Sequence, residues 1–313
     1  MAARRVGNDL SRRKSDPTSS KLGNNEAVVA AELPWGSLKV VGNMSIDFHS
    51  LPAKFTVQNL LLELFSMFEK KIQYVCIEEP LDKFLNKSLK RCDDTYLDNL
   101  LRTLGNVSEV CLPSILEALI KWYEEQISIR KRSTNENKDR SQKALLAVNY
   151  LFCIVLIELL PQLHFHPTDC EKYVNYILHL SFNEISKGNR DPAAYGINLH
   201  NCLIVAETFA EVIGVLSQTH AKLVQKTFFT LLNECRKETP LTQSGVTNII
   251  SLLMAMKFYR IKTSQVSEIE QGVSFLDELA SYYLEIDLKQ KDLKHAIVGL
   301  LVEILLPVAA VSL

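Results

Sequence analysis

The hydrophobic pattern of the chain centres on one unusually apolar stretch. Over residues 144–157 only Asn149 is not apolar. Such a run is either a membrane span or a helix packed on nearly every side. A membrane span needs about 18 or more apolar residues with few charges, and Glu158 and Pro161 interrupt any window of that length. We therefore predict a buried inner helix over 144–160 and no integral membrane span.

Apolar residues recur at helical spacing along most of the remaining chain. From Thr56 they follow the i, i+3, i+4 pattern of an amphipathic helix. Asp93–Thr95 can cap one helix, and Ser114, Thr168 and Ser267 each precede a Glu by three positions, which is a capping-box signature. Thr239 before Pro240 is a further start signal. The pattern predicts helices at 56–72, 81–90, 95–104, 114–129, 144–160, 168–187, 198–217, 220–237, from 240, 267–286 and from 292 to the end.

The predicted helices begin every 20–25 residues or so, and helix pairs therefore recur at about the 40–47 residues that are typical of HEAT and armadillo repeats. A local echo supports a repeat, because LIELLP at 156–161 resembles VEILLP at 302–307. The length is also compatible with about two globular domains. We predict an all-α, HEAT/armadillo-like helical-repeat solenoid over residues 55–313.

Two charged stretches lack any apolar period. Residues 1–54 form a predicted disordered basic tail and connector, and residues 130–143 a predicted mobile loop. The tail could instead be a mitochondrial presequence, but those segments avoid acidic residues and Asp9 is present. ArgArgLysSer ends at Ser15, which we take as a candidate phosphorylation site for basic-directed kinases.

Composition restricts the cellular setting. The net charge is −1, which gives no broad electrostatic footprint for nucleic acid. The seven cysteines are an odd number without a CxxC pair, and they indicate reduced thiols in a cytosolic or nuclear protein. They stand at 76, 92, 111, 153, 170, 202 and 235.

The sequence offers little for catalysis. His164 and His166, with Asp169 and Cys170, are the best group of metal ligands, but the chain has no HxxxH or HExxH motif. The GxGxxG, GxxxxGK[ST] and GxSxG patterns are absent too. We expect no enzyme, no metal and no cofactor.

One basic segment remains as a candidate binding surface. MKFYRIK at 256–262 interleaves basic and aromatic residues, and Lys257 and Arg260 share a helix face. The same spacing suits a solvated helix edge. We predict a protein-partner surface at Lys257, Arg260 and Lys262, and no nucleic acid.

Several longer motifs resemble the N-terminal region of the Furry proteins, the cell-morphogenesis family. The resemblance runs in order over about residues 55–311. It rests on FEKKI (68–72), EEPLDKFL (78–85), CLPSIL (111–116), WY (122–123), FCIVLIE (152–158), AEVIGVLSQ (210–218), SLLMAMKFYRIK (251–262) and KHAIVGLLVEILLPVAA (294–310). As a set these motifs are specific, whereas each one alone is a helix fragment.

The resemblance implies a non-enzymatic scaffold. Members of that family are very long helical-repeat proteins that act with NDR/LATS-type kinases and Mob coactivators in polarised growth, cell shape and neurite patterning. It implies a cytoplasmic location, at the cell cortex or at sites of polarised growth. A generic HEAT-repeat adaptor is the alternative that the pattern leaves open.

The last predicted helix is unusually apolar for the end of a repeat array, which normally carries a polar cap. We expect this helix to expose apolar side chains and the chain to be a fragment, a truncated version or a short isoform of a longer protein. The residues expected at that surface are Leu300, Leu301, Ile304, Leu305 and Val308.

Overall fold

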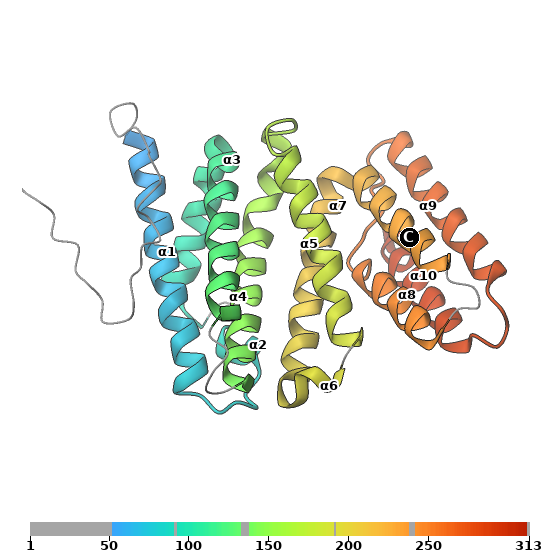
Figure 1. Cartoon of the computed structure of the whole chain (residues 1–313). Coiled ribbons are helices and arrows are strands. Elements are labelled where there is room, and N and C mark those ends of the chain that lie inside the picture. Colours follow the sequence, from blue (N-terminus) through green and yellow to red (C-terminus); the bar gives the residue numbers. More distant parts are fainter. Residues whose placement is uncertain (1–51, 91–92, 133–137, 191, 238–241, 312–313) are drawn as a thin grey trace, which may run out of the picture. The chain divides into compact units, whose positions relative to one another are not determined.

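The computed structural model describes residues 52–90, 93–132, 138–190, 192–237 and 242–311. Throughout these ranges the regular structure is helical and no strand is formed, which confirms the all-α class (Figure 1). The helices are α1 (Pro52–Ile77), α2 (Leu85–Ser88), α3 (Thr95–Arg132), α4 (Lys138–Leu159), α5 (Glu171–Arg190), α6 (Pro192–Tyr195), α7 (Leu199–Arg236), α8 (Gln243–Ala255), α9 (Val266–Glu285) and α10 (Lys291–Val311), with 3-10 turns η1 (Leu160–Phe165) and η2 (Gly196–Asn198).

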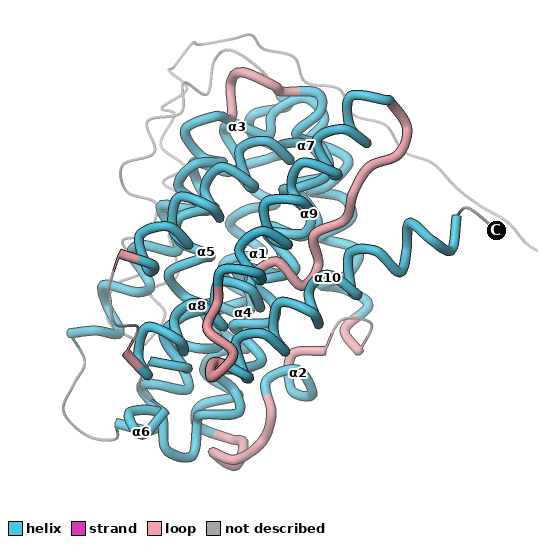
Figure 2. The backbone as a smooth tube through the Cα atoms, turned by 90° about the vertical axis from the view of Figure 1, so that its right-hand side faces the viewer, coloured by secondary structure: helices cyan, strands magenta, loops and turns pink. Residues whose placement is uncertain are grey.

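Each long helix packs mainly on helices near it in the sequence. In the unit Ile46–Leu313, which contains every described residue, α1 contacts α3 and α4, α4 contacts α3 and α7, and α5 contacts α7 and α8. α10 contacts α8 and α9. Figure 2 shows these helices joined by loops, one of the longer of which links α8 to α9.

The prediction of a buried inner helix is confirmed by α4. Every residue from Leu146 to Leu156 is buried, including Asn149. By length and composition alone, three helical stretches of the described chain are apolar enough to cross a membrane, and the most apolar of them is Lys138–Phe165. In that stretch 72% of the most apolar window is buried inside the protein, so packing against other helices accounts for its composition.

The single polar residue of the apolar run connects three helices. The Tyr123 hydroxyl of α3 donates to Asn149 Oδ1 of α4 at 3.0 Å, and Asn149 Nδ2 donates to Glu184 Oε2 of α5 at 3.3 Å. A buried amide without partners would be destabilising. Asn149 is therefore tolerated in the core because both ends of its side chain are satisfied.

Two long helices contain breaks where the sequence predicted separate helices. α3 departs from helical geometry at Cys111 (φ −133°, ψ 24°), two residues before Pro113. α7 departs from it at His220 (φ −125°, ψ 42°). A proline removes one helical hydrogen bond and its ring clashes with the preceding turn, so the α3 break has a direct cause.

The predicted loop over 130–143 is too long. α3 continues to Arg132 and α4 begins at Lys138, because lysine and arginine are good helix formers and the charged side chains of Lys138, Asp139 and Arg140 remain exposed at the start of α4. Residues 133–137 lie outside the described part of the chain, as do residues 1–51 and with them the basic tail and Ser15. The helical domain was also predicted to begin at residue 55, whereas α1 begins at Pro52.

The helix starts agree with the sequence in one place. Asp94 precedes α3, and its Oδ1 accepts from the backbone N–H groups of Tyr96 and Leu97, both at 3.1 Å. Lys71 Nζ lies 2.7 Å from Asp94 Oδ2. The capping role predicted for residues 93–95 is therefore confirmed.

Two other predicted caps are wrong or lie outside the described residues. α9 is opened by a capping box of Gln265 and Glu268, not of Ser267. The helix that Thr239 was predicted to cap begins, in its described part, at Gln243, where the Thr242 hydroxyl accepts from Gly245 N at 3.1 Å. Thr239 itself is not among the described residues.

The last helix buries part of the surface that was predicted to be exposed. Leu300 and Ile304 are buried, and α10 contacts α8 and α9. The prediction of exposure was wrong for these two residues because they lie on the face of α10 that packs against the other helices. The outward phase is still apolar: Val302, Leu305 and Leu306 are exposed.

Candidate functional site

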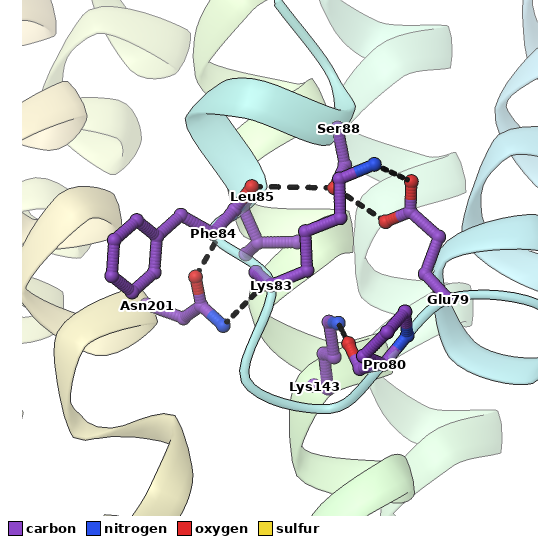
Figure 3. Close-up of polar contacts among 8 residues, drawn as sticks. All are labelled: Glu79, Pro80, Lys83, Phe84, Leu85, Ser88, Lys143 and Asn201. Atoms are coloured by element: carbon purple, nitrogen blue, oxygen red, sulfur yellow. Dashed lines mark hydrogen bonds and ion pairs between the residues drawn. The ribbon is translucent and has the colours of Figure 1, made fainter.

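The connector between α1 and α3 carries the group of polar contacts drawn in Figure 3. It includes the EEPLDKFL motif and the short helix α2. Glu79 is buried, and both of its carboxylate oxygens are used: Oε1 accepts from Lys83 Nζ at 2.6 Å and Oε2 accepts from the Ser88 hydroxyl. The Glu79 carboxylate therefore links two later residues of the same connector, Lys83 and Ser88.

A lysine of α4 holds the same connector in place. Lys143 is 0% exposed, and its Nζ donates to the backbone carbonyl of Pro80 at 2.6 Å (Figure 3). Burial lowers the pKa of Lys143, and the negative charge of Glu79 acts in the opposite direction. A buried ammonium group is stable only with partners of this kind, so Lys143 fixes the connector on α4.

An asparagine of α7 also binds the connector. Asn201 Oδ1 accepts from Leu85 N at 2.9 Å, and its Nδ2 donates to the Lys83 carbonyl at 3.4 Å. The Phe84 ring lies 4.1 Å from the His200 ring, centroid to centroid. The amide satisfies backbone groups that the connector leaves unpaired, which buried loops must otherwise hide from water.

The connector brings a serine beside a carboxylate and two lysines, which are residue types that can support catalysis. A nucleophile needs a base with a free lone pair at hydrogen-bond distance and a third group that orients the base. Here Lys143 is bonded to a backbone carbonyl, and Glu79 is shared between Ser88 and Lys83. These bonds link the connector to itself and fix it on α4.

The predicted partner segment 256–262 lies between α7 and α9. An added Cβ at Gly214 of α7 would lie 2.6 Å from Phe258 Cβ, and one at Gly272 of α9 would lie 2.4 Å from Ile261 Cγ2. The Tyr259 hydroxyl accepts from Gln225 Nε2 at 2.6 Å. Close approach at two glycines therefore fixes this segment.

The three basic residues of that segment differ in their contacts. Lys257 Nζ lies 2.6 Å from Glu207 Oε1. Arg260 Nη1 donates to the carbonyls of Lys257 and Tyr259 at 2.9 and 2.8 Å. Lys262 is half-buried. Lys257 and Arg260 therefore have structural partners, and the role of all three as a partner surface stays a prediction.

The two histidines of the candidate metal group contact backbone carbonyls. Pro113 has no N–H to donate to the Glu109 carbonyl, and His166 Nε2 lies 2.9 Å from that oxygen and 3.3 Å from the Ser108 carbonyl. His164 Nδ1 lies 2.7 Å from the Pro161 carbonyl. Among the described residues no group of three or more His, Cys, Asp or Glu side chains is placed to hold a metal.

Sequence reasoning missed the residues that fix the connector. Lys143 was assigned to a mobile loop, and Asn201 was not singled out. The available signal is that both are polar residues in the phase of a helix that otherwise faces the core. This pattern predicts that the two side chains are buried, but it does not identify the groups to which they bond.

Comparison with known proteins identifies the family of the chain. A family model described as cell morphogenesis N-terminal matches residues 142–312, which is more than half of the sequence. The chain belongs to the cell morphogenesis N-terminal family. This confirms the resemblance to the Furry and cell-morphogenesis proteins drawn from the sequence.

One curated relative is much longer than the region that aligns with this chain. The chain is 20% identical over 197 residues to the cell polarity protein mor2 of Schizosaccharomyces pombe. The aligned region covers 63% of this chain but 9% of mor2, so the chain spans less than a tenth of that relative. No solved structure matches the chain.

Proposed function

We propose that this protein is a non-enzymatic scaffold of cell morphogenesis that binds an NDR/LATS-type kinase together with its Mob coactivator. The observation that carries the proposal is membership of the cell morphogenesis N-terminal family over residues 142–312. The name of mor2, a cell polarity protein, supports a role in polarised growth and cell shape. Neurite patterning, and a site of action in the cytoplasm at the cortex or at regions of polarised growth, belong to the same proposal.

A HEAT/armadillo-like solenoid is the architecture we propose for this scaffold. The support comes from contacts between helices close in sequence, such as α3 with α4 and α7 with α8, and from the breaks that divide α3 and α7 into shorter helices. A solenoid stabilises each repeat through its neighbours and offers a long surface for extended partners.

The proposal includes no catalysis and no cofactor. Its support is the use of the polar residues in the described helices: Glu79, Lys143, Asn201 and His166 are bonded to groups of the same chain. A side chain in such a bond is less available to act on a substrate. Assays for kinase, phosphatase and hydrolase activity on the purified chain are expected to give background rates.

Binding of purified components tests the scaffold proposal. The chain is immobilised, and an NDR-type kinase is passed over it alone and together with Mob, with binding followed by interferometry. We expect binding that increases when Mob is present. Absence of binding by the kinase, with or without Mob, would contradict the proposal and favour the alternative of a generic HEAT-repeat adaptor.

A pair of charge reversals tests the predicted partner surface in the same assay. Lys262→Glu is the informative variant because Lys257 and Arg260 also have structural contacts. Lys121→Glu, at an exposed position of α3, is the matched control. If only Lys262→Glu weakens binding, the predicted partner surface at residues 257–262 is supported. Equal binding of both variants would refute this surface but would leave the scaffold proposal intact.

A further inference from the structure

An open groove separates the second half of α7 from α9. Its volume is about 390 Å³. The floor contains Phe229 of α7 and Phe275 of α9, whose ring centroids are 5.3 Å apart. Phe228 lies behind them, 5.9 Å from Phe275. The two helices therefore meet through aromatic rings and leave space above the rings.

Contacts at both ends of the groove hold its walls in place. At one end Gln271 Nε2 of α9 donates to Gln225 Oε1 of α7 at 2.9 Å. At the other end Arg236 of α7 forms an ion pair with Glu285 of α9 and stands over the Tyr282 ring at 4.6 Å. Walls fixed before binding reduce the entropy that a ligand must offset.

The α7 wall is basic. Lys222 and Lys226 line the groove and are exposed. They are four residues apart on one helix and therefore share a face. Neither has an ion-pair partner among the described residues. The opposite wall contributes Ser274 and a single carboxylate, Glu278.

We propose that this groove binds an extended acidic segment of a partner protein, with an aromatic or aliphatic side chain of that segment on the Phe229–Phe275 floor. The positive wall complements acidic residues, and the aromatic floor provides the apolar anchor that short peptide motifs require. The inference rests on the proposed function only in taking protein segments as the class of ligand.

The spacing of the groove specifies the pattern of the segment. Lys222 and Lys226 are roughly 6 Å apart along the helix axis, at about 1.5 Å per residue. Alternate residues of an extended chain are separated by roughly 6.6 Å and point to the same side. Acidic residues two positions apart therefore meet both lysines. The α7 wall from Lys222 to Asn233 is roughly 16 Å long, which accommodates about five extended residues.

A selection experiment tests the proposal and requires no identified partner. A random peptide library displayed on phage is selected on the full chain, and the enriched peptides are synthesised with a fluorescent label. We expect enrichment of sequences with two acidic residues separated by one position next to an aromatic or aliphatic residue. A library that yields no such pattern overturns the proposal.

Variants locate the binding. The labelled peptides are titrated by fluorescence anisotropy against the parent chain, against Lys222→Glu/Lys226→Glu, and against Lys70→Glu/Lys121→Glu as a control of equal charge change at exposed positions. Because the first pair replaces attraction by repulsion, we expect its affinity to fall by at least ~10-fold, while the control stays within about twofold of the parent. Equal affinity for the two double variants overturns the proposal.

A second variant and the salt dependence complete the test. Ser274→Trp fills the groove from the α9 wall without changing charge, and is expected to abolish peptide binding while the helical circular dichroism is retained. Affinity should also decrease as salt rises, because exposed charges are screened. Failure here leaves kinase–Mob binding unaffected, since the kinase would then bind elsewhere, and failure of the kinase–Mob assay leaves the peptide result standing.

Discussion

Replacement of Gly214 by alanine is the substitution for which the structure gives the most direct expectation. The added Cβ would lie 2.6 Å from Phe258 Cβ and 2.8 Å from the Phe258 carbonyl oxygen. Non-bonded carbon atoms have their optimum at roughly 3.5–4.0 Å, so α7 and the segment after α8 must separate by about 1 Å. Because the opposing atoms are backbone and Cβ, no change of rotamer relieves the overlap.

The expected magnitude combines two opposing terms. Overpacking of this kind costs about 1–3 kcal/mol, and contact with backbone places Gly214→Ala near the upper end. Alanine in place of glycine inside a helix returns up to about 1 kcal/mol. We expect a net loss of about 2 kcal/mol. In a domain of about 150–250 residues this corresponds to a fall in melting temperature of about 4–8 °C, and the fall should be somewhat smaller in this longer chain.

Urea unfolding followed by far-ultraviolet circular dichroism measures the effect, with Gly299→Ala as the matched control. Gly299 is also helical, but an added Cβ there has no atom within 4 Å, so Gly299→Ala should stabilise the protein by about 0.5–1 kcal/mol. If Gly214→Ala is as stable as Gly299→Ala, the close packing of α7 on Phe258 is refuted.

A compensating pair checks the same reasoning on the other side of the segment. Gly272→Ala places a Cβ 2.4 Å from Ile261 Cγ2, and these atoms belong to a side chain that Ile261→Ala would remove. We expect the double variant to lose less stability than the sum of the two single variants. Simple additivity would mean that the two residues do not share the space.

Three further outcomes are expected. Ile154→Asp introduces an unpaired charge at a position that is 3% exposed and should cost at least about 3 kcal/mol, whereas Val110→Asp, at 84% exposure, should melt close to the parent in the same thermal scan. The Asp94 carboxylate has a lowered pKa because of Lys71 and the start of α3. Its stabilisation is therefore present above the unfolded value near 3.8 and is lost as pH falls through the lower folded value. Asp94→Asn should reduce stability by about 0.5 kcal/mol at pH 7, after allowance for the partial exposure of Asp94, and this deficit should shrink as pH falls through the folded pKa; a deficit independent of pH would refute the ion pair. Leu305 and Leu306 are 45% and 68% exposed on α10, so we expect concentration-dependent self-association in light scattering that is removed by Leu305→Ser/Leu306→Ser, and an equally associated variant would exclude this face.

The sequence predicted those features of the fold that depend on a pattern within a single helix. The apolar run predicted α4, and the proline at 113 predicted the division of α3, because periodicity and proline act over one or two helical turns. Helix starts were less reliable. Gln265 is not among the favoured N-cap residues, yet it caps α9 with Glu268, while Ser267, which is favoured, lies inside the helix.

The contacts of the candidate site could not be predicted because they join distant parts of the chain. Lys143 and Pro80 are 63 residues apart, and Leu85 and Asn201 are 116 apart. A pattern that spans four residues contains no information on such pairs. The charged neighbours Lys138 and Arg140 suggested that Lys143 was a solvated loop residue. Its side chain instead binds the Pro80 carbonyl of the connector between α1 and α3 (Figure 3).

The same contacts bear on where the proposed scaffold would bind a partner. A lysine or carboxylate bonded inside the chain, such as Lys143 or Glu79, must break that bond before it binds anything else, and the lost bond subtracts from the affinity. An exposed lysine beside an apolar floor has no such bond to lose. The proposed groove meets this condition, because Lys222 and Lys226 are exposed next to rings that the fold has already positioned.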